Sequence, residues 1–169
     1  GDYTFIEDLL SGLMKKFSDE KIAVSLPSLR VGTLSAKVAT EIRKVRKTGF
    51  TLAPEAGSER LRLLINKGIK EEDLKAAASD IFTLGWKGLK LYFMIGLPTE
   101  TEEDILEIVR LAECVMSIGK KASGRMPQIN VSASSFIPKP WTPFQWSPQI
   151  TMEQGLGKQS VLRKELARL

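Results

Sequence analysis

The chain has 169 residues, of which 43% are hydrophobic and 27% charged, and its net charge of +5 is ordinary for one globular domain with its own core. One cysteine, Cys114, and no histidine exclude an internal disulfide and a cysteine or histidine cage for a metal. Since no apolar run approaches the roughly 20 residues that span a bilayer and nothing resembles a signal peptide, we expect a cytoplasmic protein without membrane contact.

The hydrophobic pattern predicts strands that alternate with helices. A leading helix at residues 5–17 precedes four strands at 21–26, 49–53, 89–95 and 128–136. Helices are expected over residues 33–49, from Ser58 to Gly68, over 70–86, from Thr99 onward and, at the end of the chain, over 160–169. Such alternation indicates βαβ units, and therefore a parallel sheet with right-handed crossovers.

The segment "KLYFMIGLPTETEED" joins the third strand to its helix. Thr99 and Glu102 have the spacing of a capping box, in which each side chain bonds the other residue's backbone amide. Acidic residues in a first helical turn complement the helix dipole. We therefore interpret the cluster of Glu100, Glu102, Glu103 and Asp104 as the start of a helix, and Cys114 as an inert, buried thiol farther along it.

Ligands of parallel α/β sheets bind at the carboxyl ends of the strands. The segments there are residues 25–30, Glu55 with Ser58, residues 96–98 and residues 132–138. Ser58 fits a helix N-cap as well as a ligand contact. Glu55 follows an apolar run at a strand end, where an unpaired carboxylate is costly, so we favour a ligand-facing role. No phosphate-binding glycine loop or nucleophile elbow is present, and the chemistry stays open.

Four segments in order carry a resemblance to a known family: "SLPSLR", "GFTLAPEAGSERLRLLINKG", "GLKLYFMIGLPTETEEDI" and "NVSASSFIPKPWTPF". Together they resemble the radical S-adenosylmethionine (SAM) enzymes, and are most similar to the branch of methylthiotransferases and cobalamin-linked members. The resemblance covers nearly the whole chain. It implies a partial TIM-type parallel barrel, of which this chain supplies four β/α units, the third to sixth.

The same resemblance implies a SAM site at the carboxyl edge of the barrel. Glu55 and Ser58 belong to its polar end, where Glu55 faces the ribose or the amino-acid part. Lys67 stands where relatives often have an arginine for the SAM carboxylate. The adenine is expected between Gly96 and Leu97 on one side and Phe136 and Ile137 on the other.

The family's catalytic front is absent from this sequence. Neither its Cys-x-x-x-Cys-x-x-Cys loop, which holds a [4Fe–4S] cluster, nor its glycine-glycine-glutamate element is present. We therefore expect no catalytic residue and no metal ligand here, and no cluster binding or SAM cleavage by the isolated chain. SAM is the expected cofactor, the [4Fe–4S] cluster belongs to the full-length protein only, and cobalamin is a further candidate there.

The chain is accordingly expected to be one domain, residues 1–169, and a fragment of a radical SAM catalytic domain. Its parts are a leading helix in 1–20 and an exit segment with a C-terminal helix in 137–169. The expected partner is the upstream part of the same polypeptide. An unpaired edge strand at 21–26 would favour self-association.

Two other functions remain open from the sequence alone. One is a phosphate-binding (β/α)-barrel enzyme that holds an anion near Gly57 and Ser58. The other is a non-catalytic RNA-binding module that uses a basic helix, and RNA is also a candidate substrate of the enzyme. The basic residues of that helix are Lys37, Arg43, Lys44, Arg46 and Lys47.

Overall fold

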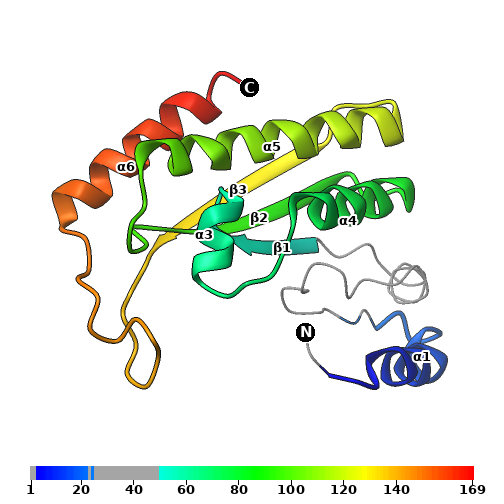
Figure 1. Ribbon diagram of the computed structural model, residues 1–169. Helices are drawn as coiled ribbons and strands as arrows, with labels where there is room; N and C mark the ends of the chain where they lie inside the picture. Colours follow the sequence, from blue (N-terminus) through cyan, green and yellow to red (C-terminus); the bar gives the residue numbers. More distant parts are fainter. Residues whose placement is uncertain (1–2, 23, 25–49) are drawn as a thin grey trace.

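The computed structural model describes residues 3–22, 24 and 50–169. In chain order its elements are α1 (Ile6–Phe17), β1 (Phe50–Glu55), α3 (Glu59–Leu64), α4 (Glu71–Thr83), β2 (Gly88–Ile95), α5 (Glu102–Ser123), β3 (Gln128–Ser135) and α6 (Met152–Leu166) (Figure 1). The predicted helix at 33–49 lies wholly outside the described residues. Half of the predicted strand at 21–26 does so too, and its described residues Lys21, Ile22 and Val24 do not form a strand. The other three predicted strands are confirmed to within two residues at each end.

The three described strands form one parallel sheet in the order β1-β2-β3. In its middle, Leu91 of β2 pairs with Leu52 on one side and Val131 on the other. The pairing of β1 shifts between Leu52 and Glu55, where Pro54 has no amide hydrogen to donate. The architecture is mixed α/β and consistent with a partial TIM-type barrel, as predicted.

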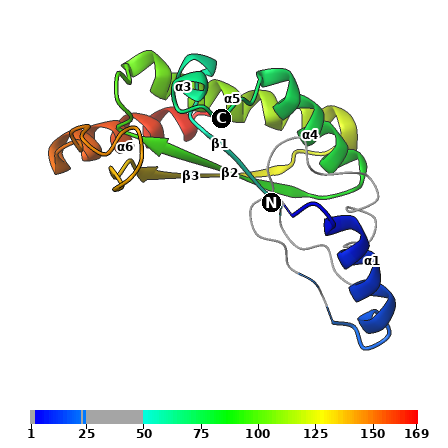
Figure 2. The same ribbon diagram turned by 60° about the horizontal axis from the view of Figure 1, so that its bottom comes forward.

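The hydrophobic core lies between the sheet and its helices. Figure 2 shows α3, α4 and α5 on the same side of the sheet. The alternate residues Leu89, Leu91, Phe93 and Ile95 of β2 point into this layer and are buried. The helices bury apolar stripes against them: Leu74, Ala77 and Ile81 from α4, and Ile105, Ile108, Ala112 and Val115 from α5.

The opposite face of the sheet is polar. Its middle row consists of Thr51, Lys90 and Asn130, which pair across the three strands. In the next rows Tyr92 lies opposite Ser132 and donates a hydrogen bond of 3.1 Å to Ser134. In a β/α barrel the face away from the helices lines the interior, so this row of polar side chains marks the inner wall.

Several predicted helix boundaries are wrong. α6 begins at Met152, eight residues before the expected start at 160. α5 begins at Glu102 with Thr101, not Thr99, as its N-cap, and Asp104 rather than Glu102 completes the capping box. Thr99 is excluded because its φ is +63° and the amide of Glu100 first closes a turn onto the carbonyl of Leu97. α3 starts at the expected N-cap Ser58, but it ends at Leu64 instead of continuing to Gly68.

Candidate functional site

The carboxyl ends of the three strands meet at one edge of the sheet, as predicted. Glu55 is the last residue of β1, Gly96 and Leu97 follow β2 directly, and Phe136 follows β3. The amide of Phe136 donates to the carbonyl of Ile95, so the ends of β2 and β3 are held together by a hydrogen bond of 2.8 Å. The segment 25–30, the fourth one expected at this edge, lies outside the described residues.

An apolar cavity of about 380 Å³ opens at this edge. Leu97 and Phe136 are buried in its wall, whereas Ile137 is 59% exposed at its margin. Phe136 meets the ring of Phe144 edge to face, with centroids 6.1 Å apart. The remaining lining comes from the end of α3, from β2 and from the exit segment: Leu64, Ile65, Asn66, Met94, Lys139, Thr142 and Pro143.

Such a composition suits a flat, mostly apolar ligand. Pockets for small molecules are lined largely by hydrophobic and aromatic groups, with a few polar groups that fix orientation. Here Asn66, Lys139 and Thr142 are the polar members of the lining. Of the residues expected to contact adenine, Leu97, Phe136 and Ile137 share this cavity, while Gly96 lies directly before Leu97.

Glu55 and Lys67, both of which the family resemblance assigns to the SAM site, form an ion pair. Lys67 Nζ lies 3.1 Å from Glu55 Oε1, and both side chains are about three-quarters buried. Glu55 holds a left-handed backbone conformation, with φ of +70°, which is uncommon for a residue with a side chain. Such strain is concentrated at functional sites. Lys67 directly follows Asn66, which lines the cavity, but neither Glu55 nor Lys67 belongs to the lining itself.

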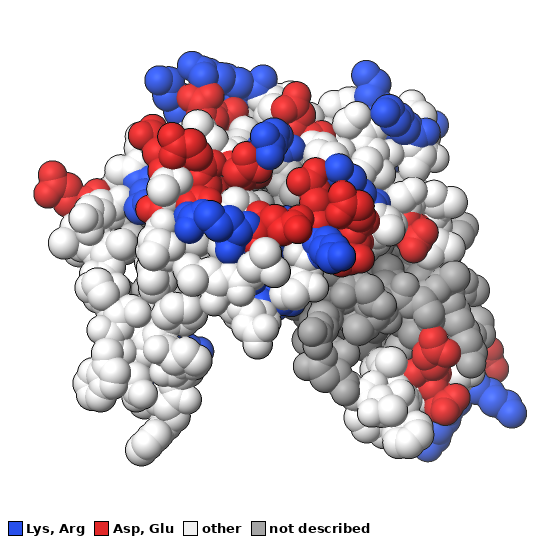
Figure 3. Space-filling model, in the orientation of Figure 1, with Lys and Arg blue, Asp and Glu red and all other residues white. Residues whose placement is uncertain are grey.

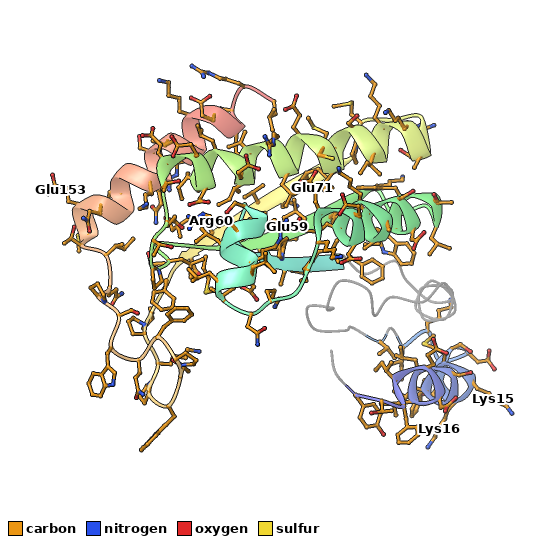
Figure 4. All side chains as sticks on the ribbon, in the orientation of Figure 1. Lys15, Lys16, Glu59, Arg60, Glu71 and Glu153 are labelled. Atoms are coloured by element: carbon orange, nitrogen blue, oxygen red, sulfur yellow. The ribbon has the colours of Figure 1, made fainter. Side chains whose placement is uncertain are left out.

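Ser58 does not line this cavity. Its hydroxyl accepts from the amide of Leu61 as the N-cap of α3 and donates to Asp104 of α5. Asp104 is 5% exposed and also receives hydrogen bonds from Arg60 and from the Thr101 amide. Figure 4 shows Arg60 on α3. The Asp104 carboxylate disfavours an anion at Ser58, which argues against the phosphate-binding alternative.

Burial and hydrogen bonds shift the pKa of Asp104 in opposite directions. Burial alone would raise the pKa of Asp104, but the hydrogen bonds from Ser58, Thr101 and Arg60 outweigh it and lower the pKa below its usual value. The carboxylate is therefore ionised at neutral pH. It joins the loop after β1 to the first turn of α5.

Glu100 is a site residue that the sequence analysis missed. Its side chain is 3% exposed, and its Oε1 lies 2.8 Å from both the amide of Gly96 and Nζ of Lys158. The acidic cluster around it predicts only the start of a helix. Its contact with Lys158 has no signal in the local sequence, because Lys158 belongs to α6, far along the chain.

Arg62 was also missed. It is 1% exposed, and its guanidinium donates to the carbonyls of Ala56, Gly57 and Ile69. Arg62 thereby links the loop that follows Glu55 to the turn before α4. Burial lowers the pKa of Arg62, although nearby carboxylates, Glu59 first among them, oppose this.

The described residues offer no metal centre. Among residues 3–22, 24 and 50–169 no three side chains of His, Cys, Asp or Glu are grouped to hold an ion. Cys114 lies in the middle of α5 as expected but is half-buried, a correction to the buried thiol that its helical stripe predicted. Within the same described ranges, no helix has both the length and the apolarity that crossing a bilayer requires.

Charges on the helical side of the molecule are mixed. Figure 3 shows acidic and basic side chains interspersed over α3, α4 and α5. A nucleic-acid surface would need basic residues clustered on one face. The exit segment at 137–151 carries a single charge, Lys139. The exit segment and the visible helical face therefore give the RNA-binding alternative no support. The basic helix proposed for RNA lies outside the described residues.

Comparison with known proteins gives two matches. The family model of the Radical SAM superfamily matches residues 2–112. The chain is also 39% identical over 145 residues to "Uncharacterized protein MJ0966" of Methanocaldococcus jannaschii, an alignment that covers 86% of this chain. It covers only 30% of that relative, so the chain spans less than a third of the relative's length.

Proposed function

Because this chain belongs to the radical SAM superfamily, we propose that it forms the SAM-binding C-terminal part of a [4Fe–4S]-dependent enzyme. The observation that carries the proposal is the cavity lined by Leu97 and Phe136, with the Glu55–Lys67 pair at the carboxyl end of the neighbouring strand β1. An apolar slot beside a carboxylate and an ammonium matches a ligand with a nucleobase at one end and an amino acid at the other.

Each part of SAM has residues of fitting chemistry. The adenine takes the apolar cavity, where Leu97 contacts one side and the ring of Phe136 the other. Glu55 can accept from a ribose hydroxyl or from the amino group, and Lys67 can neutralise the carboxylate as a point charge. Since these two side chains now pair with each other, SAM binding would exchange their mutual contact for contacts with the ligand.

SAM, when reductively cleaved, supplies a 5′-deoxyadenosyl radical that abstracts hydrogen from a substrate. The residues of this chain would hold the nucleoside, exclude water from it and fix its orientation. The polar inner face of the sheet, with Lys90, Tyr92 and Asn130, would then face the substrate, because it lines the barrel interior. A polar substrate fits this wall better than an apolar one.

The iron–sulfur cluster does not fit the residues of this chain. Fe–S clusters are held by several cysteine thiolates, and the sequence contains one cysteine and no histidine. We propose that the cluster ligands belong to another part of a longer protein, as the greater length of the relative allows.

The finer family position is part of the proposal. The segments "GLPTET" and "IPKPWTPF" support a place near the methylthiotransferase and cobalamin-linked branch. Cobalamin would then be an additional cofactor of the full-length protein. Its upstream part is the proposed partner of this chain.

The proposal predicts that full-length protein, reconstituted anaerobically with iron and sulfide and then reduced, forms 5′-deoxyadenosine from SAM. Phe136→Ala should weaken SAM binding about tenfold to a hundredfold, because the stacking of a base on an aromatic ring contributes about 1–3 kcal/mol. Glu55→Ala should abolish most nucleoside formation. Calorimetry measures the affinity, and chromatography measures the product.

Trp146→Ala serves as the matched control. This tryptophan belongs to the same exit region but is 90% exposed and lies outside the cavity lining, so its loss should leave SAM affinity unchanged. The isolated chain should form no 5′-deoxyadenosine. Failure of the reconstituted protein to cleave SAM, or unchanged affinity in Phe136→Ala, would contradict the proposal.

A further inference from the structure

The C-terminal helix contacts the turn that follows β2. Gly96 in this turn has a φ of +81°, which favours glycine. A Cβ atom at Gly96 would lie 2.6–2.9 Å from three carbon atoms of Ile150, directly before the N-cap of α6. The glycine therefore allows the chain before α6 to pack closely on the end of β2.

A buried ion pair fastens α6 to the same turn. Glu100 Oε1 accepts from the amide of Gly96 and lies 2.8 Å from Lys158 Nζ. The Glu100 side chain is 3% exposed and that of Lys158 is 24% exposed, so water screens the pair weakly. One oxygen thus joins the backbone at the end of β2 to a side chain of α6.

The turn held in this way is one wall of the proposed nucleoside cavity. Leu97 follows Gly96 directly, is 4% exposed, and lines the cavity. Its carbonyl accepts from the amide of Glu100, which closes the turn on itself. Glu100 and Leu97 therefore belong to the same hydrogen-bonded turn.

We propose that Lys158 is a positioning residue for the SAM site: through Glu100 it holds the Gly96–Leu97 turn in the place where Leu97 forms the cavity wall. The inference rests on the proposed function and adds to it a residue of α6 that does not line the cavity. Without the ammonium, Glu100 would keep a nearly buried charge with only one amide donor, an arrangement that is costly. The carboxylate would turn toward water and release the amide of Gly96.

Lys158→Met tests this inference in the full-length protein. The change keeps the length of the side chain but removes its charge. We expect SAM affinity to fall about tenfold. This affinity is measured by binding alone, without reducing the protein and without turnover. Lys158→Arg retains the positive charge and should restore most of the affinity. Lys75→Met is the matched control, because Lys75 pairs with Glu71 at 2.7 Å on the outer helix α4.

Hydrogen exchange of the peptide 94–104, followed by mass spectrometry, gives a second measure that needs no ligand. Faster exchange there in Lys158→Met, but not in Lys75→Met, supports the inference. Lys158→Met affinity within twofold of the wild type overturns it. If the wild type binds no SAM, the proposed function fails, and the exchange rate alone decides whether Lys158 holds the turn: unchanged exchange overturns that role.

Discussion

Gly57→Ala is expected to lower the free energy of unfolding by about 3 kcal/mol, the upper range for an added group in a closely packed site. A Cβ at this position would lie 2.5 Å from the amide nitrogen of Ile108 and 2.7 Å from the carbonyl oxygen of Asp104. Both atoms belong to the backbone of α5, which cannot rotate away. The added methyl group would therefore force the loop after β1 apart from α5.

Urea denaturation measures this effect, with Gly157→Ala as the control. Gly157 lies within α6, and no atom lies within 4 Å of a Cβ built there. Alanine should therefore stabilise the helix by about 0.5–1 kcal/mol through its higher helix propensity. The same substitution should thus lower the free energy of unfolding at Gly57 and raise it at Gly157. A loss below 1 kcal/mol for Gly57→Ala would show that the loop and α5 are not packed as described.

Asp104→Asn is expected to destabilise the protein by about 2–3 kcal/mol at pH 7, because charge-assisted hydrogen bonds of this kind contribute that much. Asparagine keeps the shape but loses the charge that receives bonds from Ser58, Arg60 and Thr101. The stability of the two proteins should be compared by thermal and urea unfolding across pH.

The pH dependence follows from the lowered pKa of Asp104. A carboxyl group with a folded-state pKa below its unfolded value contributes its full stability above the unfolded pKa, about 3.9. That contribution is lost as the pH falls through the folded-state value. The difference between wild type and Asp104→Asn should therefore shrink below about pH 4. Glu113→Gln, an exposed change on the same helix, should alter stability by less than about 0.5 kcal/mol at every pH. A difference for Asp104→Asn that does not depend on pH would contradict this account.

The start of α5 shows where local sequence is ambiguous. Two overlapping capping boxes are present, Thr99 with Glu102 and Thr101 with Asp104, and the sequence analysis chose the first. Both satisfy the same local rule. Only the second places a carboxylate against Ser58 and Arg60, which lie more than 40 residues earlier. Contacts distant in the sequence therefore decide where this helix begins.

The strands were predictable because their signal is local. Apolar residues alternate along β2 and are bounded by Gly88 and Gly96, and this pattern alone predicts a strand. The same reasoning placed Leu97 and Phe136 at one edge, since parallel strands end on the same side. That the two residues share a cavity depends on side-chain packing, which the pattern does not contain.

The buried ionic residues were not predictable from the sequence. Arginine is rarely fully buried, and Arg62 stands in a segment that looks like an ordinary amphipathic helix. Its carbonyl partners come from loops on both sides of α3. Likewise, Glu100 is one of several neighbouring acidic residues, and its contacts with Lys158 and with the amide of Gly96 distinguish it. Ser58 was correct as an N-cap, and its contact with Asp104 was not foreseen.

The parallel order of the sheet has a consequence for the way this chain is made. Leu52 pairs with Leu91, and Leu91 with Val131, so each pairing joins segments roughly forty residues apart. As the polypeptide leaves the ribosome, β2 therefore has to wait for all of α5 before its second neighbour exists. During that interval one edge of the central strand is open to any other extended segment. The nascent protein is thus exposed to mispairing for longer than a protein built of hairpins, and its safe folding depends on the order in which the strands appear.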